Sequence, residues 1–217
     1  MRKEFSNKFK NAYAELYKLH PQVGEQNPRF RYLRVDWFFP NHIHNVLEQV
    51  KDLGQKYFTS IDYEVCLYAG LLHDSGLVYK RETAEATGHE ERSIEYAEKE
   101  LKNLGYSQDF IIKVLECIRA TNVGYDSKLP EAILVRNADA YAHLISMHFF
   151  AKANFANDII SFIDWFENKV ERTYKKISIP ELRLEIGPLM NYYQKMLENY
   201  RKQQVSEKVY LNNITGE

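Results

Sequence analysis

Cysteine is scarce in this sequence, which has only Cys66 and Cys117 among its 217 residues. Secreted domains that depend on disulfides are much richer in cysteine, and no CxxC pair is present for a zinc ribbon or a thiol redox centre. Both cysteines lie in apolar stretches with helical character. We therefore expect two packed, reduced thiols in a cytoplasmic protein.

Long apolar runs and an excess of one charge are also missing. The longest apolar run, near residues 144–155, is interrupted by His148 and Lys152, and the first residues, MRKEFSNKFK, contain no apolar signal segment. We expect neither a membrane span nor secretion from this pattern. The 29 basic and 30 acidic side chains give a net charge of -1 and form no long blocks. Nucleic acid is therefore not expected as the main partner.

Glycine-rich functional motifs are absent as well. The patterns GxxxxGK[ST], GxGxxG and GxSxG do not occur, so an ATP loop, a dinucleotide site and a serine hydrolase have no support. The 9 glycines and 6 prolines mostly separate periodic apolar stretches, as expected for helices joined by short loops. Strand-like alternation is limited to residues 177–179. The sequence predicts an all-α fold with one domain over residues 1–217.

Periodicity and capping signals place the helices along the chain. A first amphipathic helix lies within residues 1–20 and is expected to end at His20-Pro21, and a second helix follows Pro40. A third helix, residues 62–72, is apolar on nearly every side, as a central helix would be. Further helices are expected over 90–104 before a Gly105 cap, from a Ser107 cap to 118, from Pro130 towards Phe150, and in a C-terminal extension of about 150–205.

The stretch LLHDSG, residues 71–76, sets an imidazole and a carboxylate at the end of the central helix. His73 and Asp74 project in neighbouring directions, at about 100° per residue, and Ser75-Gly76 lets the backbone turn away. Both side chains can therefore reach one point beyond the helix end. Burial of an unpaired carboxylate costs roughly several kcal/mol, which a divalent cation would remove. The alternative is a plain helix end in which Asp74 caps and His73 packs.

His42 is a candidate for a further metal ligand. In the helix after Pro40, His42 lies about 80° from the centre of the apolar stripe, whereas His44 lies about 120° away on the other side. We expect His42 to face inward and His44 to be solvated. A satisfied histidine at the edge of the core is the alternative for His42.

Asp139 stands between alanines in ILVRNADAYAHL, on or beside an apolar face. Acidic residues are rarely buried without a partner, so Asp139 requires a cation. A metal ion is one candidate, and an ion pair with Arg136 at i-3 is the other.

The set His42, His73-Asp74 and Asp139 resembles the H…HD…D signature of the HD-domain metal-dependent phosphohydrolases. The similar segments are NHIHNVLEQV, YEVCLYAGLLHDSG, GHEERSIEYAEKEL and RNADAYAHL, which together span about residues 38–145. The resemblance implies a helical metal-binding core over these residues. It also implies one divalent metal ion held by His42, His73, Asp74 and Asp139, with Mn, Fe, Co, Ni, Mg and Zn all suited to such ligands.

Two further roles follow from the resemblance. A general acid or a group that orients water is needed besides Asp74, and His89 or Glu90 in TGHEERS are the nearest candidates; the alternative is that they only begin a helix. Some family members bind a second metal through later histidines. His89 matches the first of these positions, but CIRATNVGY has Arg119, Thr121 and Asn122 where another would stand, so a second ion is not expected.

Basic residues near the motifs are candidates for binding the substrate phosphate. These are Lys80, Arg81, Arg92 and Arg119, of which only Arg92 lies within a matching helix, and surface solvation is the alternative for all of them. The predicted function is a phosphomonoesterase or phosphodiesterase that acts on a small phosphorylated metabolite, by resemblance a nucleotide. A metal- and nucleotide-binding regulatory module without turnover is the first alternative, and a structural helical protein without metal is the second. The aromatic C-terminal helices suit internal packing, a pocket wall or a homodimer contact.

Overall fold

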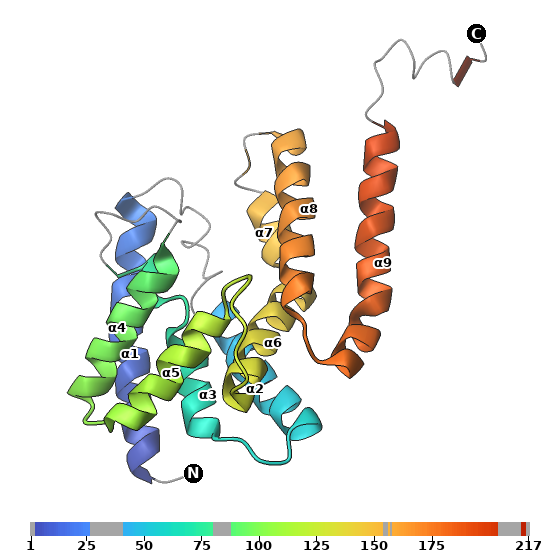
Figure 1. Cartoon of the computed structure of the whole chain (residues 1–217). Helices are drawn as coiled ribbons and strands as arrows, with labels where there is room; N and C mark the ends of the chain where they lie inside the picture. The colour runs from blue at the N-terminus through green and yellow to red at the C-terminus, as the bar shows by residue number, and fades with distance from the viewer. Residues whose placement is uncertain are drawn as a thin grey trace.

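The computed structural model of the chain is helical and describes residues 3–26, 41–79, 88–153, 156, 158–203 and 214–215 (Figure 1). No strand occurs in these residues, so the predicted all-α fold is confirmed. Residues 177–179, the strand-like stretch, instead form the connection between the last two long helices. The helices are α1 (Lys3–Gln26), α2 (Ile43–Tyr57), α3 (Tyr63–Leu72), η3 (Ser75–Leu77), α4 (His89–Asn103), α5 (Gln108–Ala120), α6 (Pro130–Ile145), α7 (His148–Ala153), α8 (Ile159–Lys176) and α9 (Pro180–Gln203).

The α3 helix lies at the centre of the fold, as its uniformly apolar sequence predicts. Asp62 caps its first turn by accepting hydrogen bonds from the backbone N–H groups of Glu64 and Val65, and every residue from 65 to 72 is buried. Neighbouring helices α2, α5 and α6 pack around it. The end of α3 is therefore held inside the molecule rather than at its surface.

Most predicted helix boundaries agree with the structure, and two do not. Ser107 accepts a hydrogen bond from the N–H of Phe110 as an N-cap, and Gly105 has the positive φ of 73° that a left-handed C-cap uses. However, α1 continues to Gln26, past the predicted end at His20-Pro21. An internal proline removes only one backbone hydrogen bond, which a long helix tolerates. The helix from Pro130 ends at Ile145, short of the predicted extent towards Phe150, because the backbone is extended at residue 146.

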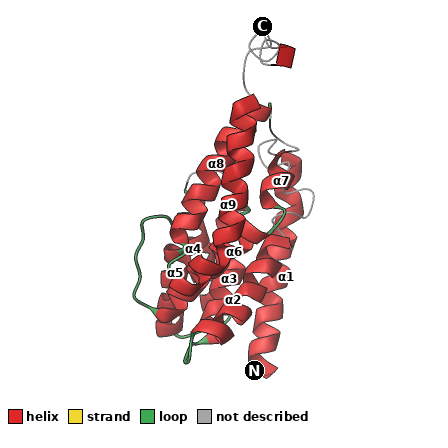
Figure 2. Cartoon of the chain, turned by 90° about the vertical axis from the view of Figure 1, so that its right-hand side faces the viewer, coloured by secondary structure: helices red, strands yellow, loops and turns green. Residues whose placement is uncertain are grey.

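Helices α8 and α9 extend away from the block formed by α1 to α5 (Figures 1 and 2). The α8 helix packs against α6, and the rings of Phe149, Phe166 and Tyr193 form a buried edge-to-face cluster beside it. The hydroxyl of Tyr193 donates to the carbonyl oxygen of Leu144 at 2.7 Å. These aromatic residues of the C-terminal extension therefore serve internal packing.

Asn137 fixes the connection between α8 and α9 to α6. Its Oδ1 accepts from the N–H groups of Ser178 and Ile179 at 2.8 and 3.2 Å, and its amide nitrogen donates to Ile133 O and Ser178 Oγ. The polar atoms of this fully buried amide are therefore all hydrogen-bonded, and these bonds hold the connection in place. The last turn of α8 is thereby held against the middle of α6.

The structure bears on two expectations, that the cysteines are packed and reduced and that no segment spans a membrane. Cys66 and Cys117 are both buried and free, and burial raises the pKa of each thiol above its usual value. Among the described helices, none combines the length and apolar content that a membrane crossing requires.

Candidate metal centre

The end of α3 presents His73 and Asp74 to the interior. The backbone N–H of His73 still donates to Ala69 O at 2.9 Å, so the helix continues up to this residue. Its ring Nδ1 lies 2.9 Å from Gly70 O. A ring nitrogen that contacts a carbonyl oxygen must carry the proton, so the lone pair of the neutral imidazole is on Nε2. His73 is therefore oriented as a metal-ligating histidine is.

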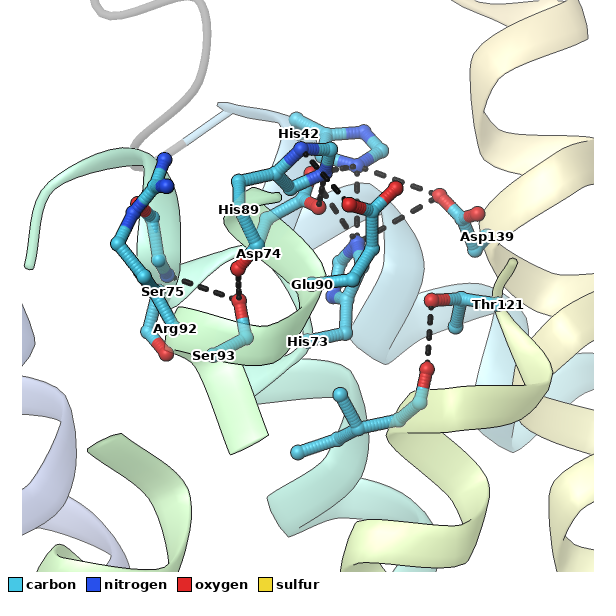
Figure 3. A network of polar contacts seen from close by, with 12 residues as sticks. His42, His73, Asp74, Ser75, His89, Glu90, Arg92, Ser93, Thr121 and Asp139 are labelled. Atoms are coloured by element: carbon cyan, nitrogen blue, oxygen red, sulfur yellow. Dashed lines mark hydrogen bonds and ion pairs between the residues drawn. The ribbon is translucent and has the colours of Figure 1, made fainter. Parts of the chain in front are cut away.

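Four polar groups from α2, α3 and α6 converge at this point (Figure 3). The Nε2 atom of His42 lies 3.3 Å from His73 Nε2, 3.6 Å from Asp74 Oδ2 and 3.5 Å from Asp139 Oδ1. His73 Nε2 lies 3.3 Å from Asp74 Oδ2 and 3.5 Å from Asp139 Oδ1. His42, His73 and Asp139 are almost completely buried, and the Asp74 side chain is 16% exposed. We call these four residues the His-Asp cluster.

The spacing of the His-Asp cluster fits one divalent cation. Ligand atoms about 2.1 Å from an ion are about 3.0 Å apart at the edges of an octahedron and about 3.4 Å apart at those of a tetrahedron. The separations of 3.3 to 3.6 Å in the cluster are close to these values. In addition, Asp139 Oδ1 is buried and receives no well-directed hydrogen bond in the described part of the chain. The sequence-predicted ligands are thus brought together in a suitable geometry.

Charge in the cluster is balanced by protons and by one lysine. Burial lowers the pKa of His73, but Asp74 and Asp139 outweigh this effect and raise it to about 10. Burial raises the pKa of both carboxyl groups, yet His73 beside Asp74, and Lys176 beside Asp139, hold them well below the usual range. A bound cation would take the place of the extra proton, because metal ligation requires a neutral imidazole.

The cation that pairs with Asp139 is Lys176, not Arg136. Lys176 Nζ donates to Asp139 Oδ2 at 3.1 Å, and its side chain is only 14% exposed. Arg136 instead donates to Tyr125 O at 2.9 Å and pairs with Asp126 at 3.3 Å. The alternative of an Arg136–Asp139 ion pair is therefore wrong. At i-3 on α6, Arg136 turns towards the loop after α5 rather than towards the cluster.

His143 is a site residue that the sequence reasoning did not select. Its Nδ1 lies 2.9 Å from Asp139 Oδ1 and 3.0 Å from Asp139 O, and the centre of its ring lies 4.2 Å from that of His42, with the two rings tilted by 55°. Burial and the neighbouring His42 lower the pKa of His143 to about 3, so this ring is neutral. The i,i+4 spacing from Asp139 was the available signal. His42, Asp139 and His143 also form a group whose ligand atoms lie within 4.8 Å of one another.

Helix α4 brings His89 and Glu90 to the outer side of Asp74. His89 Nε2 lies 3.4 Å from Asp74 Oδ1, the oxygen not directed at the cluster, and His89 Nδ1 lies 3.3 Å from Glu90 Oε2 (Figure 3). The imidazole of His89 is partly exposed. The three groups therefore form a chain from Glu90 to Asp74 in which a proton can be held or passed.

A close backbone approach sets this position of α4. Gly76 N donates to Ser93 Oγ at 2.8 Å, and Ser93 Oγ donates to His89 O at 2.9 Å. A Cβ atom on Gly76 would lie 1.9 Å from His89 O and 2.6 Å from Ser93 N. Only glycine therefore fits where the turn after the His-Asp dipeptide meets the start of α4.

The four predicted phosphate-binding residues have different positions. Arg92 Nε donates to Gly76 O at 3.0 Å, so this side chain ties α4 to the turn after Asp74. Arg119 lies in the last turn of α5 and makes no ion pair with the His-Asp cluster in the structure as described. Lys80 and Arg81 lie outside the described residues.

His44 behaves as the periodicity of α2 predicts. His42 is buried, whereas His44 is exposed, and its Nε2 lies 2.7 Å from the Tyr13 hydroxyl. A step of two residues, about half a helical turn, thus separates a histidine of the cluster from one at the surface.

Comparison with known proteins agrees with this geometry. A family model described as HD domain matches residues 41–144, close to the range of about 38–145 that the motifs indicate. Neither the curated proteins nor the solved structures give a match. The buried histidines and carboxylates are compatible with the metal-binding site of this family. Residues 41–144 of this chain belong to the HD domain family, as the sequence motifs predict.

Proposed function

We propose that this protein is a metal-dependent phosphohydrolase that acts on a small phosphorylated metabolite, with nucleotides as the leading class. The observation that carries the proposal is the convergence of two imidazoles and two carboxylates from the start of α2, the end of α3 and the middle of α6, in which each imidazole nitrogen lies within 3.6 Å of the other and of both carboxylate oxygens. His42, His73, Asp74 and Asp139 would hold one divalent ion. The donor set suits Mn, Fe, Co, Ni, Mg or Zn.

The neighbouring side chains have roles that follow from their positions. When bound, a divalent ion lowers the pKa of a water ligand and stabilises negative charge on a phosphoryl oxygen. His89 is the group placed to hold a proton for the leaving oxygen, because it is partly exposed and lies 3.4 Å from Asp74. Glu90 lies against the other ring nitrogen of His89 and orients that ring. Asp74 would thus hold the ion through Oδ2, which faces His73, while its Oδ1 lies beside His89.

The proposal is tested by metal analysis followed by activity. The protein as purified is analysed for bound transition metals, then assayed with phosphomonoesters, cyclic nucleotides and nucleoside triphosphates, before and after chelation and re-addition of Mn²⁺. We expect hydrolysis that chelation abolishes, that Mn²⁺ restores, and that Asp74→Asn removes. His44→Asn is the matched control, because His44 lies on the outer side of α2. Activity that is indifferent to chelation and to Asp74→Asn would refute the proposal.

A metal- and nucleotide-binding module without turnover is the second candidate. It is favoured by the stretch CIRATNVGY, which has Arg119, Thr121 and Asn122 where other members of the family carry a histidine for a second metal ion. Tight nucleotide binding without any product in the same screen would select this candidate.

A further inference from the structure

We propose that Lys169 on α8, together with Lys176, forms the subsite that binds the phosphate group of the substrate beside the His-Asp cluster. The inference rests on the proposed function, which it deepens by naming the residues that recognise the substrate anion. Both lysines belong to the C-terminal extension, outside the residues that match the HD domain family.

The side of α8 that carries these lysines faces the cluster. Lys169 and Lys176 are seven residues apart, so they lie on the same side of the helix two turns from each other. The ion pair of Lys176 with Asp139 fixes one end of this side at the cluster. Buried Phe166, Val170 and Thr173 anchor α8 next to them. The orientation of the helix therefore directs Lys169 towards the same region.

Lys169 is a partly desolvated cation. Its side chain is half-buried, and in the described part of the chain its ammonium forms no hydrogen bond or ion pair. Burial and the nearby Lys176 lower its pKa to about 8, while Asp139 and Asp74 partly oppose this. Lys169 in turn contributes to the lowered pKa of His143 and of His148. An ammonium kept from water among these groups costs free energy that a bound anion would remove.

The charges of the site identify the anion as a phosphate monoester. With a divalent ion in the cluster, the carboxylates of Asp74 and Asp139 offset the charge of the ion. The two positive charges of Lys169 and Lys176 are then left to bind an anion. The carboxylate of Glu90 does not offset them, because it lies against His89. A phosphate monoester carries close to two negative charges near neutral pH, and a diester carries only one. The two lysines therefore match a monoester better than a diester.

Binding of inorganic phosphate tests the subsite directly. Full-length protein loaded with Mn²⁺ is titrated with phosphate by calorimetry, and wild type is compared with Lys169→Gln, Lys169→Arg and Lys175→Gln. Lys175 is the matched control, since it lies on the same helix but is exposed and paired with Glu171. We expect Lys169→Gln to weaken phosphate binding at least about tenfold, since it removes a partly desolvated charge partner. Lys169→Arg should retain most of the affinity, and Lys175→Gln all of it.

Two further readouts separate recognition from a structural role. Mn²⁺ affinity should not fall in Lys169→Gln, because the substitution removes a positive charge near the ion. In steady-state kinetics, Lys169→Gln should raise KM for p-nitrophenyl phosphate more than KM for bis(p-nitrophenyl) phosphate. Equal phosphate affinity in wild type and Lys169→Gln, or no phosphate binding by wild type, would overturn the inference.

The outcomes also distinguish this inference from the proposed function. Phosphate binding that depends on Lys169, without hydrolysis of any ester, would refute the hydrolase and leave the subsite intact. Hydrolysis of esters, together with a phosphate affinity that is the same in wild type and Lys169→Gln, would support the hydrolase and refute the subsite. If the protein binds none of the six divalent ions that the His-Asp cluster suits, the proposed function fails, and the same titration on the metal-free protein decides the subsite.

Discussion

Asp139 is the residue on which the charges of the site depend. One carboxylate oxygen lies beside His42, His73 and His143, and the other accepts from Lys176. A carboxylate so deeply buried persists as an anion only because cations and hydrogen-bond donors surround it. Its two oxygens connect the proposed metal position to the C-terminal extension.

The first prediction concerns Asp139→Asn. The amide keeps the shape of the side chain but loses the negative charge that a divalent ion requires, so Mn²⁺ affinity should fall about 100-fold or more. Isothermal titration calorimetry with Mn²⁺, on protein made metal-free with a chelator, measures the change in affinity. Far-UV circular dichroism checks that the fold is retained. Asp126→Asn is the control, because that side chain is 99% exposed and pairs only with Arg136. Unaltered Mn²⁺ affinity in Asp139→Asn would exclude this residue as a ligand.

The second prediction concerns His89→Gln. If His89 holds the proton for the leaving group, kcat should fall by about 100-fold or more, the range for loss of a general acid. Mn²⁺ affinity should change little, because His89 contacts the oxygen of Asp74 that is directed away from the cluster. Parallel measurement of kcat and metal binding tests both statements. A joint loss of metal and activity would instead make His89 a ligand.

Local pattern was sufficient for some site residues and insufficient for others. The angular position of His42 in its helix, and the alanines around Asp139, are properties of short segments, so the sequence predicted that both face inward. The partner of Asp139 is 37 residues away along the chain and reaches it only because α8 packs on α6. No periodicity within α6 contains that information, and Arg136 was the nearest local alternative.

At the scale of elements, the contact between the turn after Asp74 and the start of α4 determines where His89 lies. This contact depends on Gly76, which has no room for a Cβ atom. The turn and the helix are joined by the hydroxyl of Ser93, which bonds both Gly76 N and His89 O. The motifs HDSG and HEERS thus form one structural unit although they are separated in sequence.

The third prediction is that Gly76→Ala destabilises this unit. Because the obstructing atoms are backbone, α4 must shift, and the free energy of unfolding should fall by about 3 kcal/mol or more. Urea unfolding followed by circular dichroism measures the loss. Gly187→Ala is the matched control, since nothing lies within 4 Å of its Cβ position. That substitution should be neutral or stabilise the protein by up to about 1 kcal/mol, and a similar loss in both variants would contradict the prediction.

Helix starts were easier to predict from sequence than helix ends. Asp62 and Ser107 begin helices by hydrogen bonds to their own backbone neighbours, and such bonds need only local residues. The passage of α1 through Pro21 and the extended backbone at residue 146 have no comparable signal in the neighbouring residues. Proline and apolar continuity are weak guides at such positions, because tertiary contacts decide them.

For the whole molecule, the fourth prediction is that a bound ion stabilises the fold. The His-Asp cluster joins α2, α3 and α6, so an ion held there binds the folded state and not the unfolded one. At a free Mn²⁺ concentration 100 times the Kd, the free energy of unfolding should rise by about 2.7 kcal/mol. Urea titrations with Mn²⁺ and with chelator measure the difference. In Asp139→Asn, whose Kd should be about 100-fold higher, the same Mn²⁺ concentration should stabilise the fold by only about 0.4 kcal/mol, and an undiminished difference would place the stabilising ion elsewhere.

The fifth prediction is that the C-terminal extension and the core unfold as one unit. A single domain over residues 1–217 and a homodimer both remain predictions. The contacts between α6 and α8 argue for the single domain. The bonds of Asn137 to residues 178 and 179, the pair of Lys176 with Asp139 and the hydrogen bond from Tyr193 to Leu144 O all cross this boundary. Separation of α8 from α6 would expose all of them at once.

Trp165 provides a probe for this unit, because its ring contacts His148 and Phe149 on the extension. In a Trp37→Phe background, Trp165 is the only tryptophan left of the 2 in the sequence. Its fluorescence should then change at the same urea concentration as the far-UV circular dichroism, which follows all helices. Fluorescence that changes at lower urea would mean that α8 detaches first. Lys169 and Lys176 would then leave the cluster before the core unfolds, and the phosphate subsite would open independently of the metal centre.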